Sequence, residues 1–269
     1  MFYYEVPQFE KKRLLRTEML EQIRDFPRDY LEILYAGYSD GVLHGCALRW
    51  IENRLVIGPG ILRYHKHLYL MKETFEMKCE NQDKIRYLKA QFQTPVKENG
   101  SLTGKAVICL DNIAPDPAYE IELCRFRLQE GARLRYMYEN FADCITEFDT
   151  IHLVHVPWAS PGKPSLHPII LKQFAVELLK KRDKDPLDNS FAIDILANNG
   201  IMAEDAVRMY IDTRIGNKAG KGNEGLYHGL MEIRKTGEES PLFRKAWMER
   251  RDRSYFCRRE KWEKVQFLE

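Results

Sequence analysis

No stretch of this 269-residue sequence approaches the roughly 18 consecutive apolar residues that a membrane helix needs. The first residues, MFYYEVPQFEKKRLLRTEML, also lack a basic segment followed by an apolar one, which is the pattern of a signal peptide. The sequence therefore predicts neither a membrane-spanning helix nor a signal peptide. We therefore expect a protein that is made in the cytoplasm.

Closely spaced cysteines are also absent. Zinc knuckles and compact disulfide frameworks both need cysteine pairs at short spacing, so the sequence predicts reduced thiols. The six cysteines are scattered along the chain at Cys46, Cys79, Cys109, Cys124, Cys144 and Cys257.

An excess of charge of one sign is lacking as well, because 42 Lys and Arg residues face 40 Asp and Glu residues, for a formal net charge of +2. This balance is too near neutral for the whole surface to attract nucleic acid or membranes. Hydrophobic residues make up 44% of the chain, enough for an ordinary globular protein with a substantial core. Any electrostatic partner must be recognised by a local cluster.

The motifs of common enzymes are missing too. No GxSxG elbow, HExxH pair or cysteine beside an obvious base occurs. The segment RIGNKAGKGNEG resembles a phosphate-binding loop superficially, but three residues, not four, separate Gly216 from Gly220. In addition, Gly222 follows Lys221 where a Ser or Thr is required. We expect a mobile loop here, no cofactor and no enzymatic activity.

Three histidines are a candidate metal site. His65 and His67 are two residues apart on a predicted strand, and His44 could lie across the sheet, so three imidazoles could hold zinc. The favoured alternative is that His65 and Lys66 form the tip of a hairpin, where histidine tolerates a left-handed backbone. No metal is therefore expected.

A second histidine pair, His152 and His155, lies in the predicted strand 150–156. A spacing of three on a strand places the two rings on opposite faces of the sheet. They could not share one ion without a kink in the backbone.

Apolar periodicity predicts a helix over residues 8–26, which Pro27 should end. Its apolar stripe is formed by Leu15, Met19, Ile23 and Phe26. The favoured interpretation is that this stripe packs against the helix's own domain, and the alternative is a docking or oligomer helix.

From residue 31 to about 130 the pattern changes to short strands broken by Gly, Pro, Asn and Asp, with no helices between them. This arrangement favours an antiparallel β-sandwich or small barrel. In the last strand the apolar side switches near Leu123, which predicts a β-bulge. The predicted strands are 46–50, 55–57, 68–71, 85–96, 106–110 and 119–128.

Helices follow the proline-rich loop PWASPGKPSLHP. One should begin at Pro168, and a second should span 188–198 with Asp188 as its cap and Asn199-Gly200 as its stop. Two more are predicted over 203–215, ended by Gly216, and over 224–235.

The fold class is therefore α+β. We predict an N-terminal helical segment (1–30), a β-rich module (31–160) and a C-terminal helical domain with a basic aromatic tail (161–269).

The tail, residues 244–266, holds nine Arg or Lys residues against four acids, interleaved with aromatic residues. It could bind nucleic acid through phosphates and stacking, form a protein interface, or be a terminal helix with its aromatics packed inward. The candidate contact residues are Trp247, Arg250, Arg251, Tyr255, Arg258, Arg259 and Trp262.

The stretch DGVLHGCALRWIENRLVIGPGILRYHKHLYLM (40–71) has a Gly-rich entry at Gly45, a strand, a polar break, a second strand and the corner Gly58-Pro59-Gly60. A hairpin then returns through Tyr69. This order resembles a module of phage tail-fibre and baseplate-associated proteins and of phage-tail-like contractile particles.

The resemblance implies a structural adaptor that acts through protein interfaces and is assembled into a virion or a tail-like particle. Its partners would be other tail or baseplate proteins and further copies of itself. Trp50, Tyr64 and Tyr69 are then expected to be partly exposed in the isolated chain. At the corner, Gly58 and Gly60 should adopt backbone angles that a side chain would forbid. The alternative is a nucleic-acid-associated protein that uses the basic tail.

Overall fold

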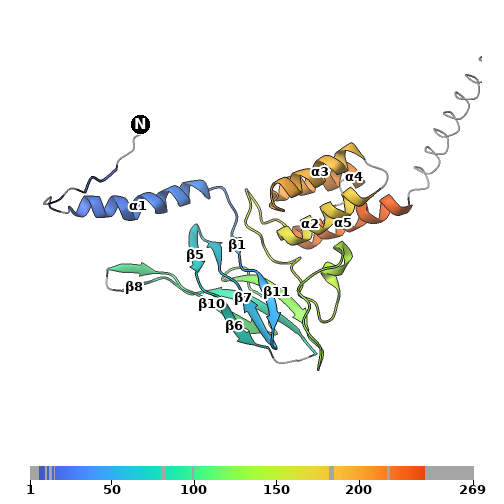
Figure 1. The fold of residues 1–269 in the computed structure, drawn as a ribbon, viewed down its shortest axis with the longest axis horizontal. Coiled ribbons are helices and arrows are strands. Elements are labelled where there is room, and N and C mark those ends of the chain that lie inside the picture. Colours follow the sequence, from blue (N-terminus) through green and yellow to red (C-terminus); the bar gives the residue numbers. More distant parts are fainter. Residues whose placement is uncertain are drawn as a thin grey trace, which may run out of the picture.

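The computed structural model describes residues 6–9, 11, 14, 16–79, 83–98, 100–181, 185–216 and 219–239. Within them an N-terminal helix, α1 (Thr17–Leu34), precedes antiparallel sheets and then a group of helices, which confirms the predicted α+β class (Figure 1).

The strands occupy the first half of the chain. They are β1 (Gly41–Gly45), β2 (Leu48–Ile51), β3 (Arg54–Ile57), β4 (Gly60–Tyr64), β5 (His67–Met71), β6 (Phe75–Lys78), β7 (Ile85–Phe92), β8 (Val96–Glu98), β9 (Ser101–Thr103), β10 (Ala106–Asp111) and β11 (Glu120–Arg127). A 3-10 helix and four α-helices follow: η1 (Phe141–Ile145), α2 (Pro168–Lys180), α3 (Pro186–Ala197), α4 (Glu204–Ile215) and α5 (Gly222–Glu239).

The strands form several small sheets. Among the described residues, three sheets of three strands have the orders β1-β4-β5, β2-β3-β6 and β10-β7-β11, and β8 pairs with β9 in a hairpin. All of these pairings are antiparallel. Antiparallel neighbours need only short turns, which agrees with a sequence that has no helices between its predicted strands.

The predicted bulge in the last strand is present. The pairing of β11 with β7 shifts in register between Glu122 and Cys124, at Leu123. Ile121 and Leu123 are buried before the shift, and Cys124 is buried directly after it. One extra residue therefore turns both halves of the apolar pattern toward the same core.

The corner Gly58-Pro59-Gly60 joins β3 to β4, but neither of its glycines has a positive φ angle. The predicted backbone angles at Gly58 and Gly60 are therefore wrong. A Cβ atom on Gly60 would lie 2.3 Å from the Cys46 Sγ and 2.6 Å from the Cys46 backbone nitrogen. Gly60 is thus required by a close approach of two chain segments, whereas Gly45 has a φ of 72°.

The first helix differs from the prediction at both ends. It begins at Thr17, not at residue 8, and it continues through Pro27 to Leu34. A proline lacks the N–H that would bind the carbonyl four residues earlier, here that of Ile23. Because α1 buries no residue, water can bind that carbonyl, and the helix is not interrupted.

Residues 150–156 do not form the predicted continuous strand. They make isolated bridges, in which Arg125 and His152 exchange two backbone hydrogen bonds of 2.8 and 3.2 Å. The chain then turns, and the Val156 amide donates to the Leu153 carbonyl at 3.2 Å. The turn allows Leu153, Val154 and Val156 all to be buried, which an alternating strand would not.

The helix predicted over 188–198 begins earlier, because Asp185 is its N-cap and accepts a hydrogen bond from the Leu187 amide. Asp188 is not the cap. It lies in the first turn, where its carboxylate accepts from the Tyr210 hydroxyl at 2.8 Å. The predicted start at Pro168 and the stop at Gly216 are confirmed.

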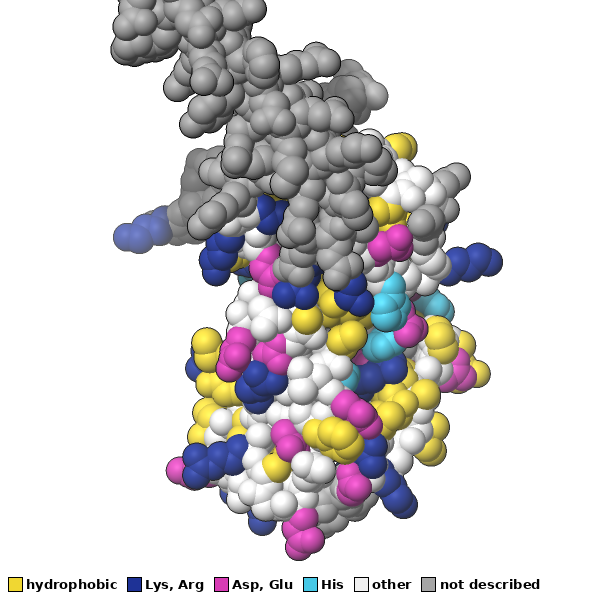
Figure 2. Space-filling view, turned by 90° about the vertical axis from the view of Figure 1, so that its right-hand side faces the viewer, with side chains coloured by type: hydrophobic (Ala, Val, Ile, Leu, Met, Phe, Trp, Pro, Cys, Tyr) yellow, Lys and Arg dark blue, Asp and Glu magenta, His cyan; other side chains and the backbone are white. Residues whose placement is uncertain are grey.

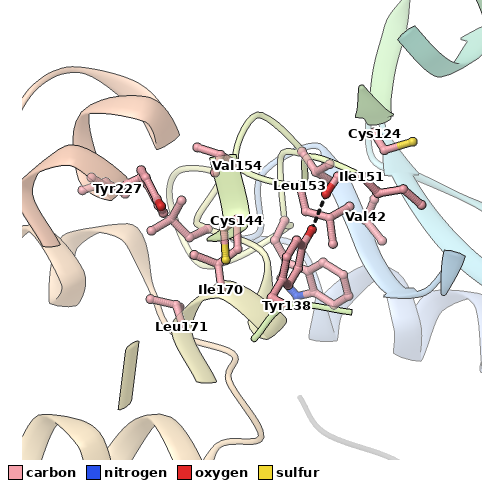
Figure 3. Close-up of a cluster of buried hydrophobic side chains, with 14 of the residues drawn as sticks. Val42, Cys124, Tyr138, Cys144, Ile151, Leu153, Val154, Ile170, Leu171 and Tyr227 are labelled. Carbon is pink, nitrogen blue, oxygen red and sulfur yellow. Dashed lines mark hydrogen bonds between the residues drawn. The ribbon is translucent and has the colours of Figure 1, made fainter. Parts of the chain in front are cut away.

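Most of the buried apolar side chains in the described residues form one cluster that extends from the sheets into the helices. Figure 3 shows part of it, with Val42 of β1 and Cys124 of β11 on one side and Tyr227 of α5 on the other. The Tyr138 hydroxyl donates to the Ile151 carbonyl at 2.6 Å inside this cluster. The predicted boundary near residue 160 therefore crosses a continuous core.

Candidate protein-interaction surface

Helix α1 differs from the other described α-helices, because none of its 18 residues is buried. Soluble proteins rarely leave a contiguous apolar patch uncovered unless it binds something. Between 49% and 78% of each of its large apolar side chains at Leu20, Ile23, Phe26, Tyr30 and Ile33 is exposed.

The charged side chains of α1 pair with one another. Asp25 accepts from Arg24 at 2.7 Å and from Arg28 at 3.0 Å, and Glu21 lies 3.9 Å from Arg24. The hydrogen bond from Arg24 lowers the pKa of Asp25 below its usual value. Such exposed pairs add little stability. Their main consequence is that the charges of Arg24 and Arg28 are neutralised within the helix.

The apolar stripe and the paired charges make α1 suited to contact another protein. Binding of a complementary apolar surface to this face is favourable, because water is released from both surfaces. The helix lies to one side of the sheets and helices, as Figure 1 shows. A partner could therefore reach it without disturbing the core.

Tyr64 and Tyr69 are partly exposed, as expected, but their rings are already engaged within the molecule. Tyr64 stacks on Phe92 with ring centroids 3.9 Å apart, and Tyr69 meets the same ring edge-on at 4.9 Å. The Tyr64 hydroxyl also donates to the Ala118 carbonyl at 2.5 Å. These rings join the sheet of β4 and β5 to the sheet of β7.

Trp50 is also partly exposed and packs at the edge of the buried cluster. The seven candidate residues of the basic tail, from Trp247 to Trp262, lie outside the described residues.

An apolar cavity of about 580 Å³ lies between β5 and β10. Nearby, the hairpin of β8 and β9 carries exposed Val96 and Leu102. The side chains that line the cavity include Leu62, Leu68, Met71, Leu102, Val107 and Ile108.

A second, more polar cavity of about 680 Å³ lies beside the start of α5. Arg208 donates to both the Glu204 carboxylate and the carbonyls of Ala219 and Gly220. These bonds tie the loop between α4 and α5 to α4, so they serve loop closure. The segment that resembles a phosphate loop follows a helix, as predicted, and not a strand.

Charges of both signs are mixed on the visible face of the molecule (Figure 2). Figure 2 shows one side of the molecule, on which basic, acidic and apolar side chains are interspersed and neither sign forms a continuous field. This agrees with the near-neutral composition.

The three candidate zinc ligands are placed as the hairpin interpretation predicted. Tyr64 pairs with His67 across the turn, and His65 and Lys66 at its tip have φ angles of 47° and 69°. The His65 ring stacks on Tyr64 at 4.1 Å. Within the part of the chain that the structure describes, no three His, Cys, Asp or Glu side chains, His44 included, are grouped to hold a metal ion.

The second histidine pair is held in a partly enclosed setting. The His152 Nε2 atom lies 2.5 Å from the Thr146 carbonyl oxygen. Burial lowers the pKa of both His152 and His155, which favours the neutral form of each ring.

The part of α1 beyond Pro27 was missed by the sequence analysis. Tyr30 and Ile33 extend the stripe of Ile23 and Phe26 at spacings of four and three residues. That spacing was visible in the sequence, but the expected stop at Pro27 hid it.

No helix in the described part of the chain combines the length and hydropathy required to cross a membrane.

No family model matches the sequence, and no curated protein matches it either. Among solved structures, the chain is similar to the crystal structure of TssK, with a TM-score of 0.38 and 8% identity over 87% of this chain and 69% of that chain. It is also similar to the cryo-electron microscopy structure of the type VI secretion system TssK-TssF-TssG baseplate subcomplex. There the TM-score is 0.36, with 8% identity over 87% of this chain and all of that chain (100%).

Proposed function

We propose that this protein is a structural subunit of a phage tail or a phage-tail-like contractile particle, at the baseplate or the fibre attachment. It acts by binding neighbouring subunits and catalyses no reaction. The observation that carries the proposal is α1, a helix whose apolar stripe is left uncovered by the residues that the structure describes.

The stripe supports a role in an assembly. Burying one large apolar side chain contributes about 1.5–3 kcal/mol. Burial of five such partly exposed side chains offsets part of the entropy that is lost on association. An isolated globular protein would gain nothing from keeping them in water.

The particle is proposed from the sequence of residues 40–71, which resembles a module of tail-fibre and baseplate-associated proteins. In the structure this stretch forms β1 to β5 in two small sheets, closed by the tight corner at Gly60 and by the His65-Lys66 turn. Its two tyrosines, Tyr64 and Tyr69, are packed internally on Phe92. The module is thus a rigid support, to which α1 adds an exposed contact.

The test is to purify intact contractile particles from cells that produce the tagged full-length protein. We expect the chain in fixed stoichiometry by mass spectrometry, and label density at one end of the particle by electron microscopy. A preparation of complete particles that lacks the chain would refute the proposal. Cells expressing the tag alone are the control for carry-over.

A further inference from the structure

The apolar side chains of α1 follow the spacing of a coiled coil. The intervals between them are four, three, four and three residues, an average of 3.5, which keeps one seam facing a neighbouring helix along its whole length. The residues are Met19, Ile23, Phe26, Tyr30 and Ile33.

The seam carries no charge, and neither does the row on one side of it, where Leu20, Pro27 and Leu34 lie. Asp29 flanks the other side, where its carboxylate lies 3.4 Å from Arg28. The two arginines of the helix, Arg24 and Arg28, point away from the seam and pair with acids of the same helix. A partner therefore needs no excess of either sign. It needs an apolar seam of matching length and spacing.

The other described helices cannot supply that seam, because their apolar faces are already used. One residue in each that is completely or almost completely buried illustrates this: Phe174 in α2, Ile195 in α3, Val207 in α4 and Leu230 in α5. A second copy of α1 meets the requirement, because identical uncharged seams are complementary to each other by symmetry.

The position of α1 makes such pairing geometrically open. Figure 1 shows the helix extending beside the sheets and well separated from α2 to α5. Its exposed residues include Leu20 and Leu34, at the two ends of the uncharged row beside the seam. A second helix can therefore lie along α1 while both globular bodies stay apart.

We infer that α1 is a self-association helix, which joins two or more copies of this chain through the seam of Met19, Ile23, Phe26, Tyr30 and Ile33. This deepens the proposed function, on whose interaction surface it rests, by naming the partner as a second copy.

The experiment measures the molar mass of the full-length protein by analytical ultracentrifugation over a dilution series. We expect a multiple of 31.8 kDa that falls to the single-chain mass on dilution. Ile23→Lys places a charge in the seam and should weaken association on the order of 100-fold or more. Glu21→Lys adds the same side chain on the outer face and should leave association unchanged.

Hydrogen exchange locates the contact. Amides of α1 should be protected at high concentration and lose protection on dilution, and Ile23→Lys should remove the difference. Amides of the sheets and of helices α2 to α5 should exchange equally in all samples, since no residue of α1 is buried against them.

A wild-type protein that stays at 31.8 kDa at every concentration would overturn the inference, as would an Ile23→Lys variant that keeps the wild-type mass. The two proposals fail separately. A monomeric protein found in particles refutes self-association alone, whereas an α1-dependent oligomer absent from particles refutes the particle assignment alone.

Discussion

Gly60 and Gly45 lie where β1 and β4 approach each other, and each excludes a side chain for its own reason. A Cβ on Gly60 would overlap Cys46, and Gly45 has the positive φ angle that side chains disfavour. Gly58, two residues from Gly60, has neither constraint. A Cβ there would lie 3.4 Å from the nearest atom, the Ala47 carbonyl oxygen.

We therefore predict that Gly60→Ala lowers the free energy of unfolding by about 1–3 kcal/mol through overpacking. Gly58→Ala is the matched control and should change it by less than about 0.5 kcal/mol. Urea denaturation of both variants measures the difference. Equal stability of the two variants would contradict the close approach seen at Gly60.

His167 is a second position where the surroundings decide the chemistry. Its Nδ1 accepts the Ile169 amide at 3.2 Å and so caps α2, while its ring meets Trp158 edge-on at 4.8 Å. Burial lowers the pKa of His167 to about 3 from its usual 6.5. The folded protein therefore binds fewer protons than the unfolded chain between these values, and stability falls as the pH drops below about 6.5.

The slope from this one group is at most about 1.4 kcal/mol per pH unit. The ring retains partial contact with solvent, so the loss is smaller than that limit. His167→Asn keeps a capping acceptor and removes the titration. We predict a flatter decline in stability between pH 6.5 and 4 for the variant, measured by urea denaturation at each pH. Parallel curves for the two proteins would argue against the lowered pKa.

At the scale of the element, α1 is a long helix that lacks the packed apolar face which usually stabilises helices of its length. A helix of 18 residues normally gains most of its stability from a packed apolar face. Here the described residues leave the face uncovered, and Pro27 lies inside the helix at a cost of about 3 kcal/mol relative to alanine.

Pro27→Ala should therefore slow amide exchange across α1 and raise the helical circular dichroism signal. The midpoint of unfolding of the sheets and later helices should not move, because α1 buries no residue against them. Glu21→Ala, which adds an alanine at an exposed position of the same helix, is the control. A matching rise in the midpoint would mean that α1 is coupled to the body.

Local elements followed from the sequence where a short pattern suffices. Pro168 begins α2 because it needs no hydrogen-bond donor at that position, and Gly216 ends α4 because it adopts a left-handed backbone. The cap of α3 was assigned to Asp188, although Asp185, which precedes Pro186 and accepts from the Leu187 amide, is an equally local signal. The contact that Asp188 makes instead is with Tyr210, 22 residues away. No local pattern contains such a contact.

At the scale of the whole molecule, the sheets and the later helices share one core. Phe141 of η1 is fully buried, with ring centroids 5.1 Å from Phe174 and 4.7 Å from Tyr227. Its carbonyl accepts from the Tyr227 hydroxyl at 2.8 Å, and its amide donates to Glu177 at 2.6 Å. The short helix η1 thus connects the segment after the sheets to α2 and α5.

Phe141→Ala should cost about 3–5 kcal/mol, the usual price of removing a buried aromatic ring. Since the core is continuous, we predict that β7 and α5 lose protection from hydrogen exchange together in urea, at one lowered midpoint. Val107→Ala, at a half-exposed position of β10, is the control and should have a small effect. Loss of protection in α5 alone would show that the two halves unfold independently.

For the apolar surface of α1 as well, the sequence and the tertiary structure gave different information. The sequence showed an apolar stripe on α1, but the same stripe would suit a helix buried in its own domain, which was the favoured interpretation. Periodicity specifies which side chains share a face and not what covers them. Only the arrangement of the other described elements shows that they leave this face uncovered.

Patterns of neighbouring residues were therefore enough to predict several features from the sequence. These are the α+β order, the bulge at Leu123, the hairpin tip at His65-Lys66, the start of α2 and the end of α4. The passage of α1 through Pro27, the space that excludes a Cβ at Gly60 and the exposure of the α1 seam depend on segments distant in sequence. Contacts of that kind exist only once the chain has folded, so they follow from packing in three dimensions.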